Sequence, residues 1–205
     1  QIQLSNFTDV YSLVFDVRNQ QEVQNAINSL PEDWKNIDVL VNNAGNAHGL
    51  EPISDANISD WDAMMDGNVK GLLYVSQPII KLMKANNSGH IVNISSVAAR
   101  QTYANGTVYC ASKKAVDVIS EGMRLELTEF GIKVTNVQPG AVETDFSKVR
   151  FKGDEERAAT VYAGYEPLIA EDIADAISYC VNAPDRVSIA EICIYPKAQA
   201  EPRTI

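Results

Sequence analysis

The chain has 205 residues, of which 17 are Lys or Arg and 27 are Asp or Glu, so its formal net charge is −10 at pH 7. A general nucleic-acid surface and an anionic-membrane surface both need clustered positive charge, and this balance argues against both classes of partner. Apolar residues make up 45% of the sequence, enough for one substantial core, and we predict a single domain over residues 1–205. No apolar run approaches the roughly 18 residues of a membrane span and the first residues do not resemble a signal peptide, so we expect a cytoplasmic protein.

Three cysteines are present, Cys110, Cys180 and Cys193. Their odd number and their spacing are not typical of a disulfide framework or a zinc site, because such sites need paired or closely spaced ligands. The sequence therefore predicts reduced thiols and no metal.

Short β-branched or aromatic runs alternate with longer helical segments along the chain. The predicted strands are Val10–Phe15, Asp38–Val41, His90–Ile94, Lys133–Val137 and Glu191–Tyr195. The predicted helices are Gln20–Leu30, Ser59–Asn86, Val108–Phe130 and Ala170–Asn182, with Gly67, Gly71 and Pro78 as possible interruptions of the second one. This alternation predicts an α/β fold with a doubly wound, Rossmann-like parallel sheet.

Polar residues follow several predicted strands directly. Asp16 follows the first, Asn42-Asn43-Ala44-Gly45 the second, Ser96 the third and Pro139-Gly140 the fourth. Open parallel sheets bind ligands beyond the carboxyl ends of their strands, so these residues predict a binding site there. Two simpler interpretations stay open: the Asn-Gly block can be an ordinary turn, and Asp16 can cap the following helix.

Tyr109 and Lys113 stand one helical turn apart in the sequence Tyr109-Cys110-Ala111-Ser112-Lys113. A lysine ammonium beside a phenol favours the ionised phenol, so we expect the pKa of Tyr109 to be lowered and its side chain to act as an acid or base. The Ser96 hydroxyl would position a carbonyl oxygen, although Ser95 competes for this role. The alternative is an ordinary exposed helix face.

These motifs, together with Asn68 in the second predicted helix, resemble the short-chain dehydrogenase/reductase family over essentially the whole chain. The resemblance implies an oxidoreductase that acts on CH–OH groups. It implies a catalytic tetrad in which Tyr109 exchanges a proton, Ser96 orients the substrate, Lys113 tunes Tyr109 and binds the nicotinamide ribose, and Asn68 holds a water. Without that context, Asn68 could simply cap a helix kink near Gly67.

The resemblance also implies which residues bind the dinucleotide. Asp16 and Val17 would contact the adenine, Asn43 would lie beside the adenosine ribose, and Gly45 would keep the backbone close to the cofactor. Tyr109 and Lys113 complete the set with a segment expected to hold the nicotinamide carboxamide and pyrophosphate, formed by Pro139, Gly140, Val142 and Thr144. His48 and His90 have no nucleophile or metal partner in view.

Two segments, Glu143–Asp154 and Tyr195–Gln199, are similar to the NADP-dependent 3-hydroxy acid dehydrogenases, which include serine 3-dehydrogenases. This implies NADP, with NAD left open, and a small 3-hydroxy acid such as serine or allo-threonine as substrate. Arg150, or alternatively Arg100, would bind the substrate carboxylate. Alternatives are a polyol, sugar or 3-oxoacyl substrate on the same fold, or a non-catalytic dinucleotide-binding protein. The resemblance also implies a homotetramer formed through the two long helices.

The family pattern opens with a strand, a glycine-rich phosphate loop, a helix and a second strand before the position of Asp16. Only Gln1–Phe15 precede that aspartate here. We therefore expect the first strand-helix-strand unit to lie outside residues 1–205, in the same molecule or in another chain, and the folded protein to be heavier than these residues imply.

Overall fold

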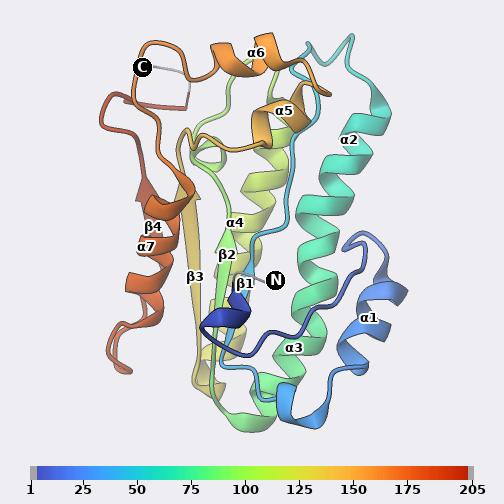
Figure 1. Ribbon diagram of the computed structural model, residues 1–205, viewed down its shortest axis with the longest axis vertical. Helices are drawn as coiled ribbons and strands as arrows, with labels where there is room; N and C mark the ends of the chain where they lie inside the picture. The colour runs from blue at the N-terminus through green and yellow to red at the C-terminus, as the bar shows by residue number, and fades with distance from the viewer. Residues whose placement is uncertain (1–3, 203–205) are drawn as a thin grey trace.

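A four-stranded parallel sheet forms the centre of the molecule in the computed structural model, which describes residues 4–202 (Figure 1). The strand order is β1-β2-β3-β4, and every neighbouring pair is parallel. The bounds are Val39–Asn42 for β1, Gly89–Ile94 for β2, Ile132–Pro139 for β3 and Glu191–Ile194 for β4. The predicted Rossmann-like α/β class is confirmed.

Helices of very different length connect the strands. The α-helices are Gln20–Asn28 (α1), Ile58–Met65 (α2), Leu72–Asn86 (α3), Thr107–Leu127 (α4), Phe146–Arg150 (α5), Glu155–Thr160 (α6) and Ala170–Val181 (α7). Short 3₁₀ turns occupy Leu4–Asn6, Glu32–Trp34, Val97–Ala99 and Thr128–Phe130. The four predicted helices are present, whereas α5 and α6 were not predicted.

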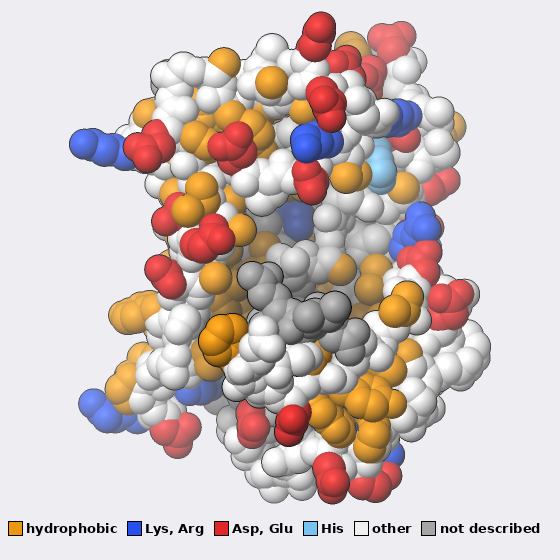
Figure 2. Space-filling model, in the orientation of Figure 1, with side chains coloured by type: hydrophobic (Ala, Val, Ile, Leu, Met, Phe, Trp, Pro, Cys, Tyr) orange, Lys and Arg blue, Asp and Glu red, His pale blue; other side chains and the backbone are white. Residues whose placement is uncertain are grey.

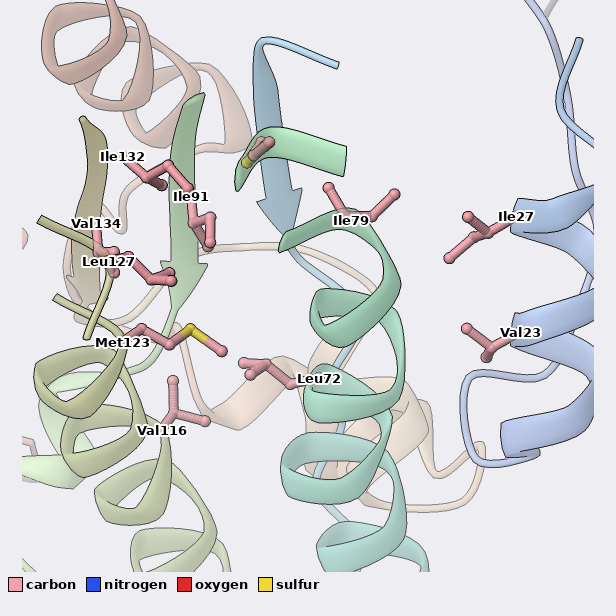
Figure 3. Close-up of a cluster of buried hydrophobic side chains, with 11 residues drawn as sticks. Val23, Ile27, Leu72, Ile79, Ile91, Val116, Met123, Leu127, Ile132 and Val134 are labelled. Atoms are coloured by element: carbon pink, nitrogen blue, oxygen red, sulfur yellow. The ribbon is translucent and has the colours of Figure 1, made fainter. Parts of the chain in front are cut away.

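The main core lies where α1, α3 and α4 meet β2 and β3. In Figure 3, Met123 and Val116 of α4 point toward Leu72 of α3, and Val23 and Ile27 of α1 lie on the other side of α3. The central strand β2 is buried along almost its whole length. Strands covered on both faces read as apolar runs, which is why the sequence predicted this part of the sheet well.

The predicted helix Ser59–Asn86 is one continuous run with a change of pitch in its middle. Between α2 and α3, residues Asp66–Gly71 form a π-helical segment. Both glycines of the predicted interruption lie in this segment, and a Cβ on Gly71 would come within 3.0 Å of the Val17 side chain. Pro78, in contrast, lies inside α3 without ending it.

The predicted strand Val10–Phe15 is wrong. These residues form no strand, the Val14 side chain is fully exposed, and the Tyr11 ring instead packs against Trp34 with centroids 5.6 Å apart. A β-branched or aromatic run becomes a strand only when a neighbouring backbone pairs with it. Within the described residues β1 pairs with β2 alone, so this segment has no ladder to join.

Among the helices of residues 4–202, none has both the length and the apolar character needed to cross a bilayer. All three cysteines are free thiols, with Cys110 and Cys180 buried and Cys193 exposed.

Candidate active site

The polar residues predicted as a site gather at the carboxyl ends of the strands, the end of the sheet near α5 and α6 (Figure 1). The side of the molecule seen in Figure 2 is hollowed in its middle, below the end that carries α5 and α6, with a Lys or Arg side chain inside the hollow. Parallel strands place the residues that follow them at one edge of the sheet, so segments far apart in sequence meet here.

Tyr109 lies in the first turn of α4 and is only 8% exposed. Its hydroxyl is hydrogen-bonded to the Ser96 side chain. Burial raises the pKa of the phenol above its usual value of 10, and the hydrogen bond with Ser96 opposes this only in part. The expectation that Lys113 lowers the pKa of Tyr109 is therefore wrong for this structure, because desolvation outweighs every nearby charge.

Lys113 is buried beneath the same surface, 6% exposed. Its Nζ donates a hydrogen bond to the Ile94 carbonyl at the end of β2, at 3.0 Å. Burial lowers the pKa of the ammonium from 10.5 to about 8, and the negative charge of Asp117 opposes that shift. A Cβ on Gly45 would lie 3.2 Å from this Nζ and from Asn68 Oδ1, so a side chain there would require these groups to shift by a few tenths of an ångström.

The two adjacent serines have different surroundings. Ser96 Oγ accepts from the Ala98 N–H at 3.1 Å, lies 3.5 Å from the Pro139 carbonyl and reaches Tyr109. Ser95 Oγ turns to the other side, where it donates to Asp117 at 2.8 Å. The geometry thus favours Ser96 over Ser95 as the partner of Tyr109.

Asn68 is buried in the π-helical segment, and its amide is fully engaged with the protein. Its Nδ2 donates to the Asn46 carbonyl at 2.8 Å and to Ser112 Oγ at 3.0 Å, while its Oδ1 accepts from the Asn46 N–H at 2.8 Å. Asn68 therefore fixes the loop after β1 against α4. Its predicted role as the holder of a water stays a prediction.

Arg150, at the end of α5, lies over the tyrosine. Its guanidinium carbon is 5.0 Å from the centroid of the Tyr109 ring and 5.9 Å from that of Phe146, and its Nη2 donates to Tyr103 Oη at 2.7 Å. No carboxylate of the described residues forms an ion pair with Arg150. A cation without an acidic partner beside a reactive hydroxyl is suited to bind an anionic group.

We define the lid as α5 and α6 with the residues between them, 146–160. The Gly49 N–H donates to the Arg150 carbonyl at 2.9 Å, Lys152 pairs with Asp60 at 2.9 Å, and Arg157 lies 3.7 Å from Glu51. These contacts hold the lid down, and the cavity beneath it is small, about 20 Å³. Residues lining it include Tyr109, Arg150, His48, Trp61, Met64 and Asn105.

Arg100, the alternative predicted ligand for the carboxylate, lies outside the cavity, and the two histidines, which were not predicted as site residues, differ from each other in position. Arg100 donates to Gln138 and lies 3.7 Å from Glu191, and it is not among the residues lining the cavity. His90 is buried in β2 with Nε2 2.8 Å from Thr135 Oγ1, and burial lowers its pKa to about 4. His48, expected to be an uninvolved loop residue, lines the cavity. Within residues 4–202, no cluster of His, Cys, Asp and Glu could hold a metal ion.

Asp16 lies in an open polar groove of about 700 Å³ that Asp66 also lines. Both carboxylate oxygens of Asp16 accept from the Arg18 guanidinium, and these bonds lower the pKa of the carboxyl to about 2. Asp16 also accepts from the Arg18 N–H, as in an Asx turn, whereas Asn19 caps α1. The capping alternative for Asp16 is therefore replaced by an Asx turn.

The other predicted cofactor residues follow the same edge. Val17 packs toward Gly71, and Asn43 is exposed directly after β1. The segment Asn42-Asn43-Ala44-Gly45 is anchored in the core at its first residue, because Asn42 Nδ2 donates hydrogen bonds to Asn93 Oδ1 and Ser76 Oγ. Pro139 ends β3, and three residues follow it toward the lid: Gly140, Val142 and Thr144.

Several residues of the site were not predicted: Asn46, Tyr103, Phe146 and Asp117. The ring of Tyr103 fills the space that a Cβ on Gly106 would occupy. Only Asp117 had a sequence signal, since it lies one helical turn beyond Lys113. The others depend on loop conformations that no local pattern indicates.

A parallel α/β sheet with a half-buried serine and a buried tyrosine and lysine at its carboxyl end is the arrangement of an α/β dehydrogenase. The sequence pattern of the short chain dehydrogenase family matches residues 2–155, and the chain belongs to that family. It is an oxidoreductase by this membership.

Two relatives and two solved structures are similar to this chain over most of its length. A probable NADP-dependent dehydrogenase of Haemophilus influenzae is 43% identical over 92% of this chain and 75% of the relative. An NADP-dependent 3-hydroxy acid dehydrogenase of Salmonella typhi is 42% identical over 94% and 78%. The closed form of a serine dehydrogenase complexed with NADP⁺ superimposes with a TM-score of 0.93 at 39% identity, covering 97% of this chain and 82% of that chain. Serine dehydrogenase from Escherichia coli gives a TM-score of 0.81 at 34% identity, covering 98% and 84%.

Proposed function

We propose that this protein is an NADP-dependent dehydrogenase that interconverts a small 3-hydroxy acid, such as serine or allo-threonine, and the corresponding 3-oxo acid. The observation that carries the proposal is the cation of Arg150 above Tyr109, which is itself bonded to Ser96. It combines a proton donor for a carbonyl oxygen with a binding group for a carboxylate. The names of the relatives, an NADP-dependent 3-hydroxy acid dehydrogenase and a serine dehydrogenase with NADP⁺, support the same substrate and cofactor.

The residues divide the proton chemistry between them. Ser96 Oγ orients the carbonyl oxygen, and Tyr109 Oη donates the proton that converts it to the hydroxyl. The raised pKa of Tyr109 keeps the phenol protonated at neutral pH, which suits donation in the direction of reduction. NADPH, when bound, supplies the hydride for the carbonyl carbon, and NADP⁺ accepts it in the reverse direction.

The chain's own groups fit such a cofactor. Within the described residues, Lys113 Nζ has one hydrogen bond, to Ile94, which leaves two N–H donors for ribose hydroxyls. The close approach of Gly45 to this Nζ keeps a side chain out of the same space. We propose that Asp16, Val17 and Asn43 bind the adenosine end, and that the nicotinamide end is held by Pro139, Gly140, Val142 and Thr144.

We expect Arg150→Ala to raise the KM for the hydroxy acid by about 10- to 150-fold, the equivalent of losing a charge-assisted hydrogen bond worth about 1.5 to 3 kcal/mol. Steady-state kinetics with NADP⁺ at saturation measure it. Arg100→Ala is the matched control, since Arg100 contacts Gln138 and Glu191 instead. If both variants keep KM within about twofold of the parent, the carboxylate is held by another residue.

Substrate class is tested by following NADPH absorbance with 3-hydroxy acids, polyols, sugars and 3-oxoacyl esters in parallel. Preference for the acids supports the proposal. Turnover of uncharged alcohols alone would favour the alternative of a different alcohol or ketone, and binding of NADP⁺ with no turnover of any of them would favour a non-catalytic protein.

We further propose a cytoplasmic homotetramer. Free cysteines are typical of a reducing compartment. Apolar side chains are exposed on the long helices, with Leu73 of α3 at 41% and Val118 and Leu125 of α4 at 59% and 77%. Unpartnered apolar helix faces commonly mark interfaces between subunits.

Native mass spectrometry tests this assembly. We expect four copies per particle, because the exposed apolar faces of α3 and α4 would then be covered. Monomers at micromolar concentration would contradict the tetramer.

A further inference from the structure

Asp117 is a nearly buried carboxylate behind the site, with a side chain 12% exposed. Its Oδ1 accepts three hydrogen bonds: from Ser95 Oγ at 2.8 Å, Asn136 Nδ2 at 2.8 Å and Gln138 Nε2 at 3.2 Å. One carboxylate oxygen therefore ties α4 to β3 and to the residue that follows β2. Buried charges are retained where such bonds satisfy them.

The partners of Asp117 adjoin groups of the site. Ser95 precedes Ser96 in the chain, and its Oγ also lies 3.0 Å from the Lys113 carbonyl. Gln138 precedes Pro139, whose carbonyl is 3.5 Å from Ser96 Oγ. Asp117 thus joins the end of β2, which leads into Ser96, and the end of β3 to α4, the helix that carries Lys113.

Charge links Asp117 to Lys113 as well. Asp117 lies one helical turn beyond Lys113 and is the charge that opposes the lowered pKa of its ammonium. Around this ammonium, the π-helical segment Asp66–Gly71 contributes the neutral Asn68 amide, and β2 contributes the Ile94 carbonyl. Within one helical turn of Lys113 on α4, the titratable groups are Tyr109, Cys110, Lys114 and Asp117. In the lid, the Arg150 cation lies over Tyr109.

We propose that Asp117 is a positioning residue that holds Ser96 and Lys113 at their working separation and keeps the Lys113 ammonium charged when the cofactor binds. The inference rests on the proposed function, in which Lys113 binds the nicotinamide ribose. Asp117 itself lies behind the site and acts through Ser95, Gln138 and Lys113.

Asp117→Asn tests the charge, because it keeps the shape and one acceptor oxygen. NADP⁺ is titrated into the full chain by calorimetry at pH 6 and pH 8. We expect the Kd of the variant to match the parent within about twofold at pH 6, where Lys113 is protonated in both. Without the Asp117 charge we expect the pKa of Lys113 to fall by about one further unit from about 8. The charged fraction of Lys113 at pH 8 would then be about fivefold smaller than in the parent, and we expect binding to be about fivefold weaker.

Two variants serve as controls. Lys114→Ala removes the exposed ammonium that lies 3.6 Å from the other oxygen of Asp117, and it should leave the Kd within about twofold of the parent at both pH values. Asp117→Glu restores the negative charge and should restore the binding at pH 8. A loss in Asp117→Asn that is equal at both pH values, or no loss at either, overturns the proposal.

Ser95→Ala tests the tether separately and remains informative should Asp117→Asn not fold. It removes the donor that links the end of β2 to α4 and leaves the carboxylate in place. We expect kcat to fall about tenfold with the pH dependence of NADP⁺ binding unchanged, and a kcat within about twofold of the parent overturns the tether. Tyr109→Phe, assayed beside these variants, separates failure of the Asp117 proposal from failure of the proposed function. Normal turnover in Tyr109→Phe would contradict the proposed function itself.

Discussion

Tyr109→Phe is expected to lower kcat by about 10²- to 10⁴-fold, the usual contribution of a positioned acid or base. The phenylalanine ring fills the same space beside Phe146 and Arg150, so only the hydroxyl bonded to Ser96 is lost. Affinity for NADP⁺ should therefore remain within about twofold of the parent. Single-turnover kinetics combined with a calorimetric Kd separate the two quantities.

Tyr103→Phe is the matched control for this experiment. It also removes one phenolic hydroxyl near the cavity, the Tyr103 Oη that accepts a hydrogen bond from Arg150. It should act on the KM for the acid through the placement of Arg150 and leave kcat within about tenfold. Near-normal kcat in Tyr109→Phe would remove Tyr109 from the proton transfer.

Lys113→Met is expected to reduce both cofactor affinity and turnover. The methionine keeps most of the buried stem and removes the ammonium that bonds the Ile94 carbonyl. Loss of charge-assisted bonds to a ribose costs about 1.5 to 3 kcal/mol, so the Kd for NADP⁺ should rise about 10- to 150-fold. We expect kcat to fall by at least about 10²-fold, because the nicotinamide ribose would lose the group proposed to hold it in place for the reaction.

Lys114→Ala, at the next position and 63% exposed, shows what removal of a lysine from α4 does without touching the site. A fall in kcat without any change in the Kd for NADP⁺ would contradict a cofactor role for Lys113. An effect on the Kd alone would instead limit the lysine to binding.

The two central strands of the sheet, β2 and β3, could be predicted because they are buried along almost their whole length. Largely apolar short runs such as His90–Ile94 are typical of strands that are covered on both faces. The position of the site followed from the same strands, because parallel strands bring the residues after them to one edge. Ser96 was predicted in this way, and Tyr109 and Lys113 were predicted from their spacing of one helical turn. The structure places Ser96 beside Tyr109 and Lys113 against the end of β2.

Other features depend on contacts that no local pattern contains. Val10–Phe15 has the composition of a strand but, in the described residues, no partner strand. The sign of the pKa shift of Tyr109 was predicted from its neighbour in sequence, whereas the lid that buries it comes from a distant segment. Arg150 was identified by its charge and by its position in the segment that follows the predicted cofactor loop, and the aromatic rings around it became visible only in the fold.

The π-helical pitch of Asp66–Gly71 sets which way the two flanking helices face. A π turn holds about one residue more than an α turn, so if the same residues took up α-helical pitch, the two ends of the helix would rotate by about 100° relative to each other. Met64 on one side lines the cavity, while Leu72 on the other packs into the core. Such a change of pitch would leave the hydrophobic composition unchanged and yet turn either the cavity wall or the core contact away. Variants that keep the π turn are therefore expected to keep both contacts, whereas variants that convert it to α pitch at unchanged length are expected to lose one of them.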